Sequence, residues 1–346
     1  MGIVSDRQIV AIHTVTGTPV WQLLASGYTK LKWTRALREV SMCDVTVPVG
    51  IAGVPDIVAC LHWVSVWDEH GREMYWRGPI QRRERGRTWL HIAAGDPASL
   101  LREGTRCPIT KRWESADPAD IAAELFGAAI ELHSLNLRVV VRPDPRGQRF
   151  DFNCVADDEM LTDTIGRLEG LGLYWTVAAG TLYLGPQPFE PVTALGEDHF
   201  VDGDPILIRD GTKMFNDVLL RAGDHVSRAR VPMAGVTRQT IVRRDSMFGV
   251  SNADRAAQEA ARYLGKVRDA VSVAPGTSLD PAAPISIAQM IPSARVNVEA
   301  YGQLSPNELD SVTVTVEKGV ATVGIDLEPV NDDLPELVKP GPGQTL

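Results

Sequence analysis

The side chains able to do nucleophilic chemistry are four cysteines and seven histidines scattered along the chain. Cysteine catalysis needs a thiolate beside a histidine base. The candidates are Cys43, Cys60, Cys107 and Cys154, with His13, His62, His70, His91, His133, His199 and His225. No local motif pairs a cysteine with a histidine, and no C-x-x-C pair indicates a zinc ribbon. Because Cys43 and Cys60 lie in runs typical of strands, we expect structural thiols and no catalytic residue.

Sequence signatures of hydrolases, zinc peptidases and nucleotide-binding proteins are missing from the chain. These are G-x-S-x-G, H-E-x-x-H, G-x-x-x-x-G-K and a full G-x-G-x-x-G. Gly170 and Gly172 form half of a dinucleotide fingerprint, but they follow a predicted helix and precede a predicted strand, which is the reverse of the required order. A glycine that ends a helix is the better interpretation. We therefore predict no cofactor site and no enzyme.

An acidic loop, Glu197 to Asp204, could supply oxygen ligands to a hard cation such as calcium. It lacks the twelve-residue spacing of a known calcium loop. A solvated linker is the favoured interpretation, and we predict no metal site.

A basic segment between residues 72 and 112 holds ten basic and four acidic residues, a local charge of +6. Its densest part is a predicted hairpin with Arg82, Arg83, Arg85 and Arg87. Such arginines could touch DNA, but they serve equally well against an acidic protein surface. The formal net charge of -9 for the whole chain disfavours a general polyanion binder. We take these four arginines as a candidate protein interface.

Length and composition describe a multidomain globular protein. A chain of 346 residues exceeds what one core usually serves, and 44% hydrophobic with 23% charged residues is ordinary for folded domains. The N-terminus alternates like a strand and lacks a signal sequence, and no apolar run is long enough to span a membrane. We expect synthesis in a reducing cytoplasm, with free thiols.

The first predicted unit, residues 1–108, is mainly β. Apolar residues alternate over 43–49 and 62–67, and a turn over 68–71 starts a hairpin. The second arm of this hairpin, residues 73–80, leads through the four arginines to another strand over 88–92. These strands must position the arginines.

Three further segments follow. Residues 109–190 predict an α+β unit, with a helix that Asp117 and Pro118 start and a second one opening at Asp157-Asp158-Glu159. Residues 191–330 predict a second β-rich unit with one helix, which Ser251 caps. We found no sequence repeat relating it to the first unit. Residues 331–346 predict a flexible tail, acidic and rich in proline and glycine.

Three stretches resemble phage tail proteins. Trp21 to Leu24, then Leu31 to Ser41 with its Trp-Thr-Arg, then Val45-Thr46-Val47 resemble the start of minor tail proteins of actinobacterial siphophages. Asp157 to Gly185 is similar to the middle domain of baseplate-hub proteins. Met214 to Val218, with the alanine-rich helix over 252–264, is similar to their second barrel. Trp33 and Arg35 of the first stretch are further candidate interface residues.

The resemblance implies a structural virion protein of the tail tip. It implies two tail-tube-like β-barrels per chain flanking the α+β domain, and a homotrimer whose six barrels join a sixfold tube to a threefold tip. The expected partners are the distal tail protein ring, the tape measure protein and other minor tail proteins, with no membrane and DNA only as passing cargo. A cell-wall hydrolase and a carbohydrate-binding component of the adhesion device remain alternatives.

Overall fold

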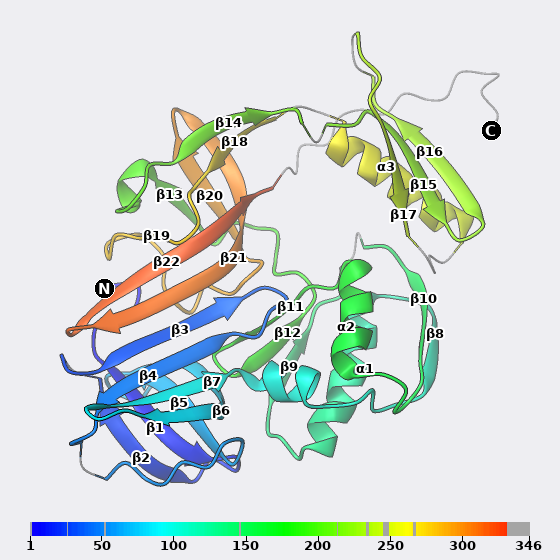
Figure 1. Cartoon of the computed structure of the whole chain (residues 1–346). Coiled ribbons are helices and arrows are strands. Elements are labelled where there is room, and N and C mark those ends of the chain that lie inside the picture. Colours follow the sequence, from blue (N-terminus) through cyan, green and yellow to red (C-terminus); the bar gives the residue numbers. More distant parts are fainter. Residues whose placement is uncertain are drawn as a thin grey trace.

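Figure 1 shows the computed structural model of the chain. It describes residues 2–330 except 26, 52, 145–146, 213, 233–234, 245–248 and 266–267. The predicted tail, residues 331–346, lies outside the described residues. The chain is mainly β, with 45% strand and 16% helix, as the sequence predicts. No helix among the described residues has the length and apolar character needed to cross a membrane.

The N-terminal strands form one half of a large sheet. They are β1 (Gln8–Thr14), β2 (Pro19–Leu24), β3 (Lys30–Ala36), β4 (Met42–Pro48), β5 (His62–Asp68), β6 (Met74–Arg85) and β7 (Trp89–Gly95). The alternation in β4 buries Cys43, Val45 and Val47, as expected for a strand with one face on a core. The turn over 68–71 and the β6–β7 hairpin are confirmed.

The C-terminal strands join the same sheet. They are β13 (Thr193–Gly196), β19 (Thr277–Ser278), β20 (Arg295–Ala300), β21 (Gln303–Glu317) and β22 (Val320–Pro329). Because β21 pairs antiparallel with β3, placing Val314 opposite Trp33, ten of the twelve strands are continuous in the order β13-β20-β21-β3-β4-β7-β6-β5-β1-β2. The other two lie off this path, where β22 pairs with β21 and β19 pairs with β22. The described residues form no closed barrel, so the arrangement in two barrels stays a prediction.

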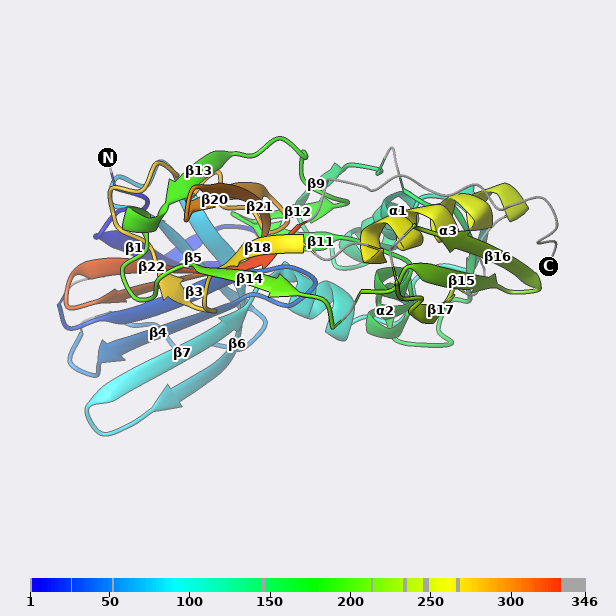
Figure 2. The ribbon, with the colours of Figure 1, turned by 90° about the horizontal axis from the view of Figure 1, so that it is seen from above.

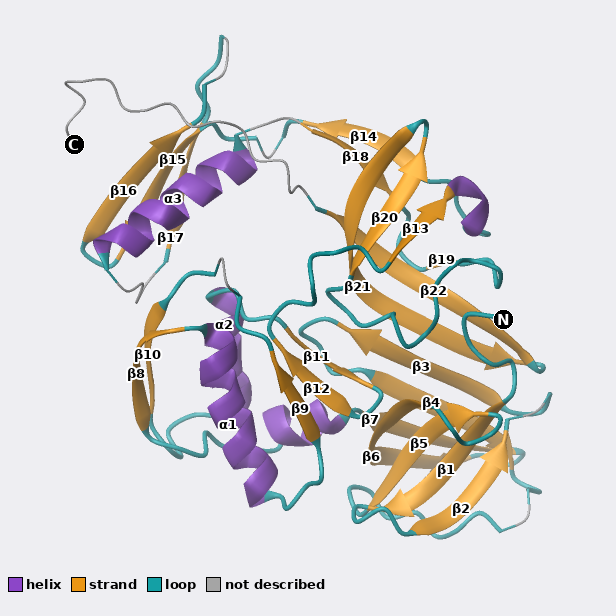
Figure 3. Ribbon diagram, turned by 180° about the vertical axis from the view of Figure 1, so that it is seen from behind, coloured by secondary structure: helices purple, strands orange, loops and turns teal. Residues whose placement is uncertain are grey.

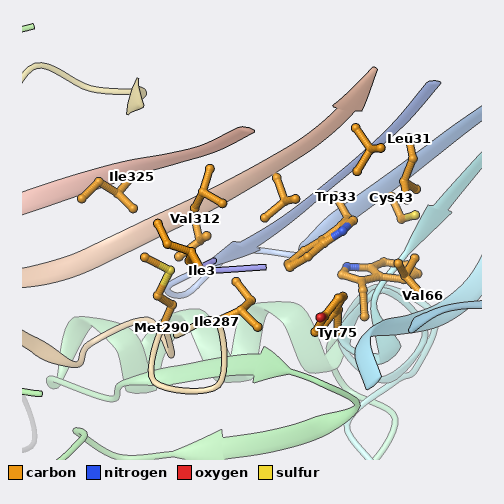
Figure 4. Close-up of a cluster of buried hydrophobic side chains, with 14 of the residues drawn as sticks. Ile3, Leu31, Trp33, Cys43, Val66, Tyr75, Ile287, Met290, Val312 and Ile325 are labelled. Atoms are coloured by element: carbon orange, nitrogen blue, oxygen red, sulfur yellow. The ribbon is translucent and has the colours of Figure 1, made fainter. Parts of the chain in front are cut away.

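The core of this sheet mixes residues from both ends of the chain. Figure 4 shows Leu31 and Trp33 of β3 and Val312 of β21 in one core, with Ile287 and Met290 in the lower part of the view. All five are almost fully buried. Since burying one large apolar side chain stabilises a fold by roughly 1.5–3 kcal/mol, this shared core holds the two ends of the chain together.

The middle unit has its own core and combines small sheets with two helices (Figure 3). Its elements are a helical turn (Ser99–Glu103), β8 (Lys111–Ala116), α1 (Pro118–Leu132), β9 (Arg138–Val141), β10 (Phe150–Cys154), α2 (Leu161–Gly170), β11 (Trp175–Ala178) and β12 (Thr181–Leu184). α1 begins as predicted, because the Asp117 carboxylate accepts a hydrogen bond of 2.9 Å from the backbone N–H of Ala119.

The prediction for the start of α2 was wrong. The acidic residues 157–159 precede the helix, and Asp157 has a positive φ of 63°. The Glu159 carbonyl instead accepts a hydrogen bond from the N–H of Cys107, 2.8 Å away. This hydrogen bond to a distant segment keeps residues 157–159 out of the helix, although their local sequence favours a helix start.

The last unit is a three-stranded sheet covered by one helix. It contains β15 (Asp217–Ala222), β16 (His225–Arg230), β17 (Gln239–Arg243) and α3 (Val250–Leu264), and a ribbon of β14 (Ile206–Asp210) and β18 (Arg268–Ser272) links it to the large sheet. A separate core lies between this sheet and α3. The prediction that Ser251 caps α3 was wrong. The helix starts one residue earlier, at Val250, and follows Gly249 with its φ of 73°.

Candidate interaction surface

Trp33 lies inside the large sheet and is not available at the surface of the chain. Its side chain is fully buried, its indole stacks on the ring of Tyr75 at 5.9 Å between centroids, and its Nε1 donates to Oε1 of Gln8 at 3.0 Å. The inward positions of β3 are Leu31, Trp33 and Arg35. Strand alternation turns Trp33 and Arg35 inward, so neither side chain is exposed on this chain. The expectation that they form an interface with another protein is therefore wrong.

Arg35 connects three distant segments through its guanidinium. Nη1 donates to the carbonyl of Ile287 at 2.6 Å and to that of Met290 at 3.0 Å, while Nη2 donates to the carbonyl of Tyr75 at 3.0 Å. Burial lowers the pKa of Arg35 to about 10, so the group remains a cation at neutral pH. Since its partners are backbone carbonyls about 40 and 250 residues away, nothing in the local sequence points to this role.

The arginine hairpin, residues 82–87 at the end of β6, is the exposed basic surface that the sequence predicts. Arg82, Arg83, Arg85 and Arg87 are all exposed. Arg83 donates to Asp56 at 3.1 Å and Arg82 lies 3.4 Å from Glu84, whereas Arg85 and Arg87 make no ion pair with any described residue. The arginine hairpin therefore carries four exposed arginines, two of which make no ion pair with a described residue.

The path of β6 explains why the hairpin projects. β5 pairs with β6 from Met74 to Pro79, and from Ile80 onward β6 pairs with β7 alone. A bulge follows Ile80, and a Cβ on Gly78 would lie 2.0 Å from the carbonyl oxygen of Gly95, so only glycine fits this crossing. Figure 2 shows the β6–β7 hairpin reaching beyond the rest of the sheet.

Two of the four thiols, Cys43 and Cys154, lie in surroundings that raise their pKa. Cys43, Cys107 and Cys154 are buried and Cys60 is exposed, and no disulfide joins them. Burial raises the pKa of Cys43, and burial together with the neighbouring Cys107 raises the pKa of Cys154 to about 11. Both Cys107 and Cys154 donate to the carbonyl of Ile109. These surroundings suit structural thiols, because a nucleophilic cysteine needs a lowered pKa.

Two side chains of the acidic loop, those of Glu197 and His199, accept hydrogen bonds from backbone N–H groups. Glu197 accepts from the N–H of Tyr301 at 2.7 Å, and Nδ1 of His199 accepts from the N–H of Gly196 at 2.8 Å. Within the part of the chain that the structure describes, no group of three or more His, Cys, Asp or Glu side chains could hold a metal ion.

Comparisons with known proteins identify the fold. No protein-family model matches the chain, and no curated protein matches it either. Among solved structures, a tail protein from Neisseria meningitidis is similar with a TM-score of 0.65 at 14% identity, covering 94% of this chain and 97% of that one. A 43 kDa tail protein of a Shewanella oneidensis prophage gives 0.62 at 15% identity, covering 93% and 97%. A prophage tail protein from Listeria monocytogenes gives 0.55 at 10%, covering 94% and 95%. The chain thus has a fold found in phage tail proteins.

Proposed function

We propose that this chain is a structural, non-enzymatic protein of a phage tail, located at the tail tip. The observation that carries the proposal is the likeness to three tail proteins, which extends over at least 93% of this chain and 95% of each of theirs. Similarity over the whole length of both chains supports a shared structural role more strongly than similarity limited to one domain. The pairing of β21 with β3 supports it further, because a sheet built from both ends of the chain suits a wall that must stay rigid.

The finer proposal is a siphophage hub that closes the distal end of the tail tube. In this proposal each chain has one barrel from residues 1–108 and one from residues 191–330, and these two barrels flank its 109–190 domain. Three chains then supply six barrels and match a sixfold tube to a threefold tip. The described part of the large sheet ends at β2 and β13, whose outer edges have no strand partner there. Open edges of this kind can pair with a neighbouring subunit around a closed ring. The remaining partners would be the distal tail protein ring, the tape measure protein and other minor tail proteins, and DNA would be passing cargo.

Imaging intact virions with this chain traced tests the proposal. We expect the chain at the tip in three copies, with its two β-rich units at equivalent positions around the tail axis. Six copies at that level, or a position on the side of the tail, would reject the hub and leave a peripheral tail protein as the better assignment. Absence of the chain from purified tails would reject the structural role itself.

The arginine hairpin would then contact protein and not DNA. Reversing all four charges (R82E, R83E, R85E and R87E) is expected to stop tail assembly. In this proposal Arg85 and Arg87, which make no ion pair with a described residue, bind acidic residues of a neighbouring tail protein. Arg138→Glu, an exposed arginine on β9, is the matched control and should leave tail assembly intact. Normal assembly of the hairpin variant, followed by failed DNA ejection, would instead assign the hairpin to DNA.

A further inference from the structure

On the outer face of the β15–β17 sheet, opposite α3, the described residues form no covering helix or strand. Val218 and Leu220 point to α3 and are buried, so the alternating Leu219 and Arg221 lie on the other face. The register places Leu219 beside Ile241, and Arg221 beside Val226 and Arg243. We call this surface the outer sheet face; it consists of Leu219, Arg221, Val226, Arg228, Arg230, Ile241 and Arg243. The sheet lies in front of α3 in Figure 1 and behind it in Figure 3.

Part of the outer sheet face is apolar. Ile241 is 55% exposed and Val226 is 45% exposed, and Leu219 lines a shallow depression together with Thr240 and Ile241. A sheet with one face on a helix usually presents polar residues on the other face. Exposed aliphatic side chains among arginines are instead typical of a protein interface.

The charge on this face is only partly neutralised. Arg228 is held by Asp217, with 2.8 Å between Nε and Oδ1, and Arg230 donates to Thr237 at 2.8 Å. Arg221 and Arg243 are direct neighbours on parallel strands and make no ion pair with any described residue. Like charges side by side are unfavourable, so this pair calls for a carboxylate. The adjacent aliphatic residues favour a peptide over the phosphates of DNA, which offer no apolar surface.

We propose that the outer sheet face binds residues 331–338 of the same chain. This segment reads Asn-Asp-Asp-Leu-Pro-Glu-Leu-Val, so it carries both carboxylates and aliphatic side chains within a few residues of one another. Asp332, Asp333 and Glu336 would neutralise Arg221 and Arg243, and the two leucines would cover Ile241 and Val226. The proposal is independent of the proposed function, since it concerns a contact within one chain.

The described end of the chain shares a cleft with the end of β17 and with Glu259 and Tyr263 of α3. Val330 lines the same cleft as Arg244, the residue that follows β17. Eight extended residues span about 26 Å, whereas a strand of six residues such as β15 is about 20 Å long. Attachment to the same chain also gives the segment a high effective concentration, so a weak contact is sufficient.

Hydrogen exchange on the full chain tests the proposal. Reversing the three carboxylates (D332K, D333K and E336K) should speed amide exchange in β16 and β17 by about threefold or more, because their cover is lost. R221E with R243E should do the same, and combining both sets of changes should restore slow exchange. Arg138→Glu, on β9 far along the chain, should change nothing in β16 and β17.

A second measurement identifies the occupant. A synthetic peptide with the sequence of residues 331–338 should bind the full chain carrying the three reversed carboxylates, with weaker binding at higher salt, and R221E with R243E should weaken it at least about tenfold. Equal exchange in all variants, or peptide binding that ignores Arg221 and Arg243, would overturn the proposal. Protection that rises with protein concentration would assign the contact to a second copy, and binding of a DNA duplex alone would assign the face to nucleic acid.

Discussion

Arg35 and the arginine hairpin use the same side chain for opposite purposes within one sheet. Arg35 is 2% exposed and its guanidinium donates to three backbone carbonyls, whereas Arg85 and Arg87 are exposed and make no ion pair with any described residue. The difference comes from their surroundings. The inner face of β3 is covered by residues around Ile287, while β7 is the only described strand that pairs with the end of β6. An arginine in a strand is therefore a core residue or a surface residue according to what covers that strand.

The largest effect is expected at the buried arginine. Arg35→Met keeps the apolar stem but removes the guanidinium hydrogen bonds to the carbonyls of Tyr75, Ile287 and Met290. The Ile287 carbonyl keeps one donor, the backbone N–H of Met290. Buried polar groups left unsatisfied are costly, so the free energy of unfolding should fall by about 2–4 kcal/mol. Urea denaturation measures it. Arg85→Met is the matched control, and it should change the stability by less than about 0.5 kcal/mol. Similar losses in both variants would contradict the role assigned to Arg35.

A buried acid extends the comparison to pH. Asp96 is 1% exposed and accepts from the backbone N–H groups of Ser41 at 2.9 Å and Ala98 at 2.8 Å. Burial raises its pKa to about 7, above its ordinary value of 3.8. A raised pKa in the folded state gives stability that is present at low pH and is lost as the pH rises through about 7.

The contribution of Asp96 to the free energy of unfolding should therefore fall by about 2 kcal/mol between pH 5.5 and pH 8. Asp96→Asn cannot titrate, so its stability should change less over the same range. Urea denaturation of both proteins at pH 5.5, 7 and 8 measures the difference. Parallel pH profiles for the two proteins would show that Asp96 does not bind a proton on acidification.

The sequence predicted the elements better than their partners. Strand alternation located β4 and β5, and Asp117 with Pro118 correctly marked the start of α1, because these signals act over a few residues. The pairing of β21 with β3 was not predictable, since it joins residues about 280 positions apart and depends on the shared core.

The same limit applies to the surfaces. Hairpin geometry was enough to expose the arginines at the end of β6, but the inward turn of Arg35 depends on carbonyls about 250 residues away. The outer sheet face was missed because Arg221 and Arg243 look like ordinary solvent-facing residues. Only the parallel pairing of β15 with β17 makes them neighbours.

The smallest effect is expected at the one ion pair between the arginine hairpin and the preceding loop that the described residues show. Arg83 and Asp56 are 3.1 Å apart, but the side chain of Asp56 is 90% exposed and that of Arg83 is 32% exposed. Water and salt screen such a pair, and holding two mobile side chains together costs entropy. A double-mutant cycle with Asp56→Asn and Arg83→Gln should give a coupling energy below about 0.5 kcal/mol, falling further in high salt. A coupling above about 1 kcal/mol would mean that the loop holds Arg83 in place, and fewer arginines of the hairpin would then be free to meet a partner.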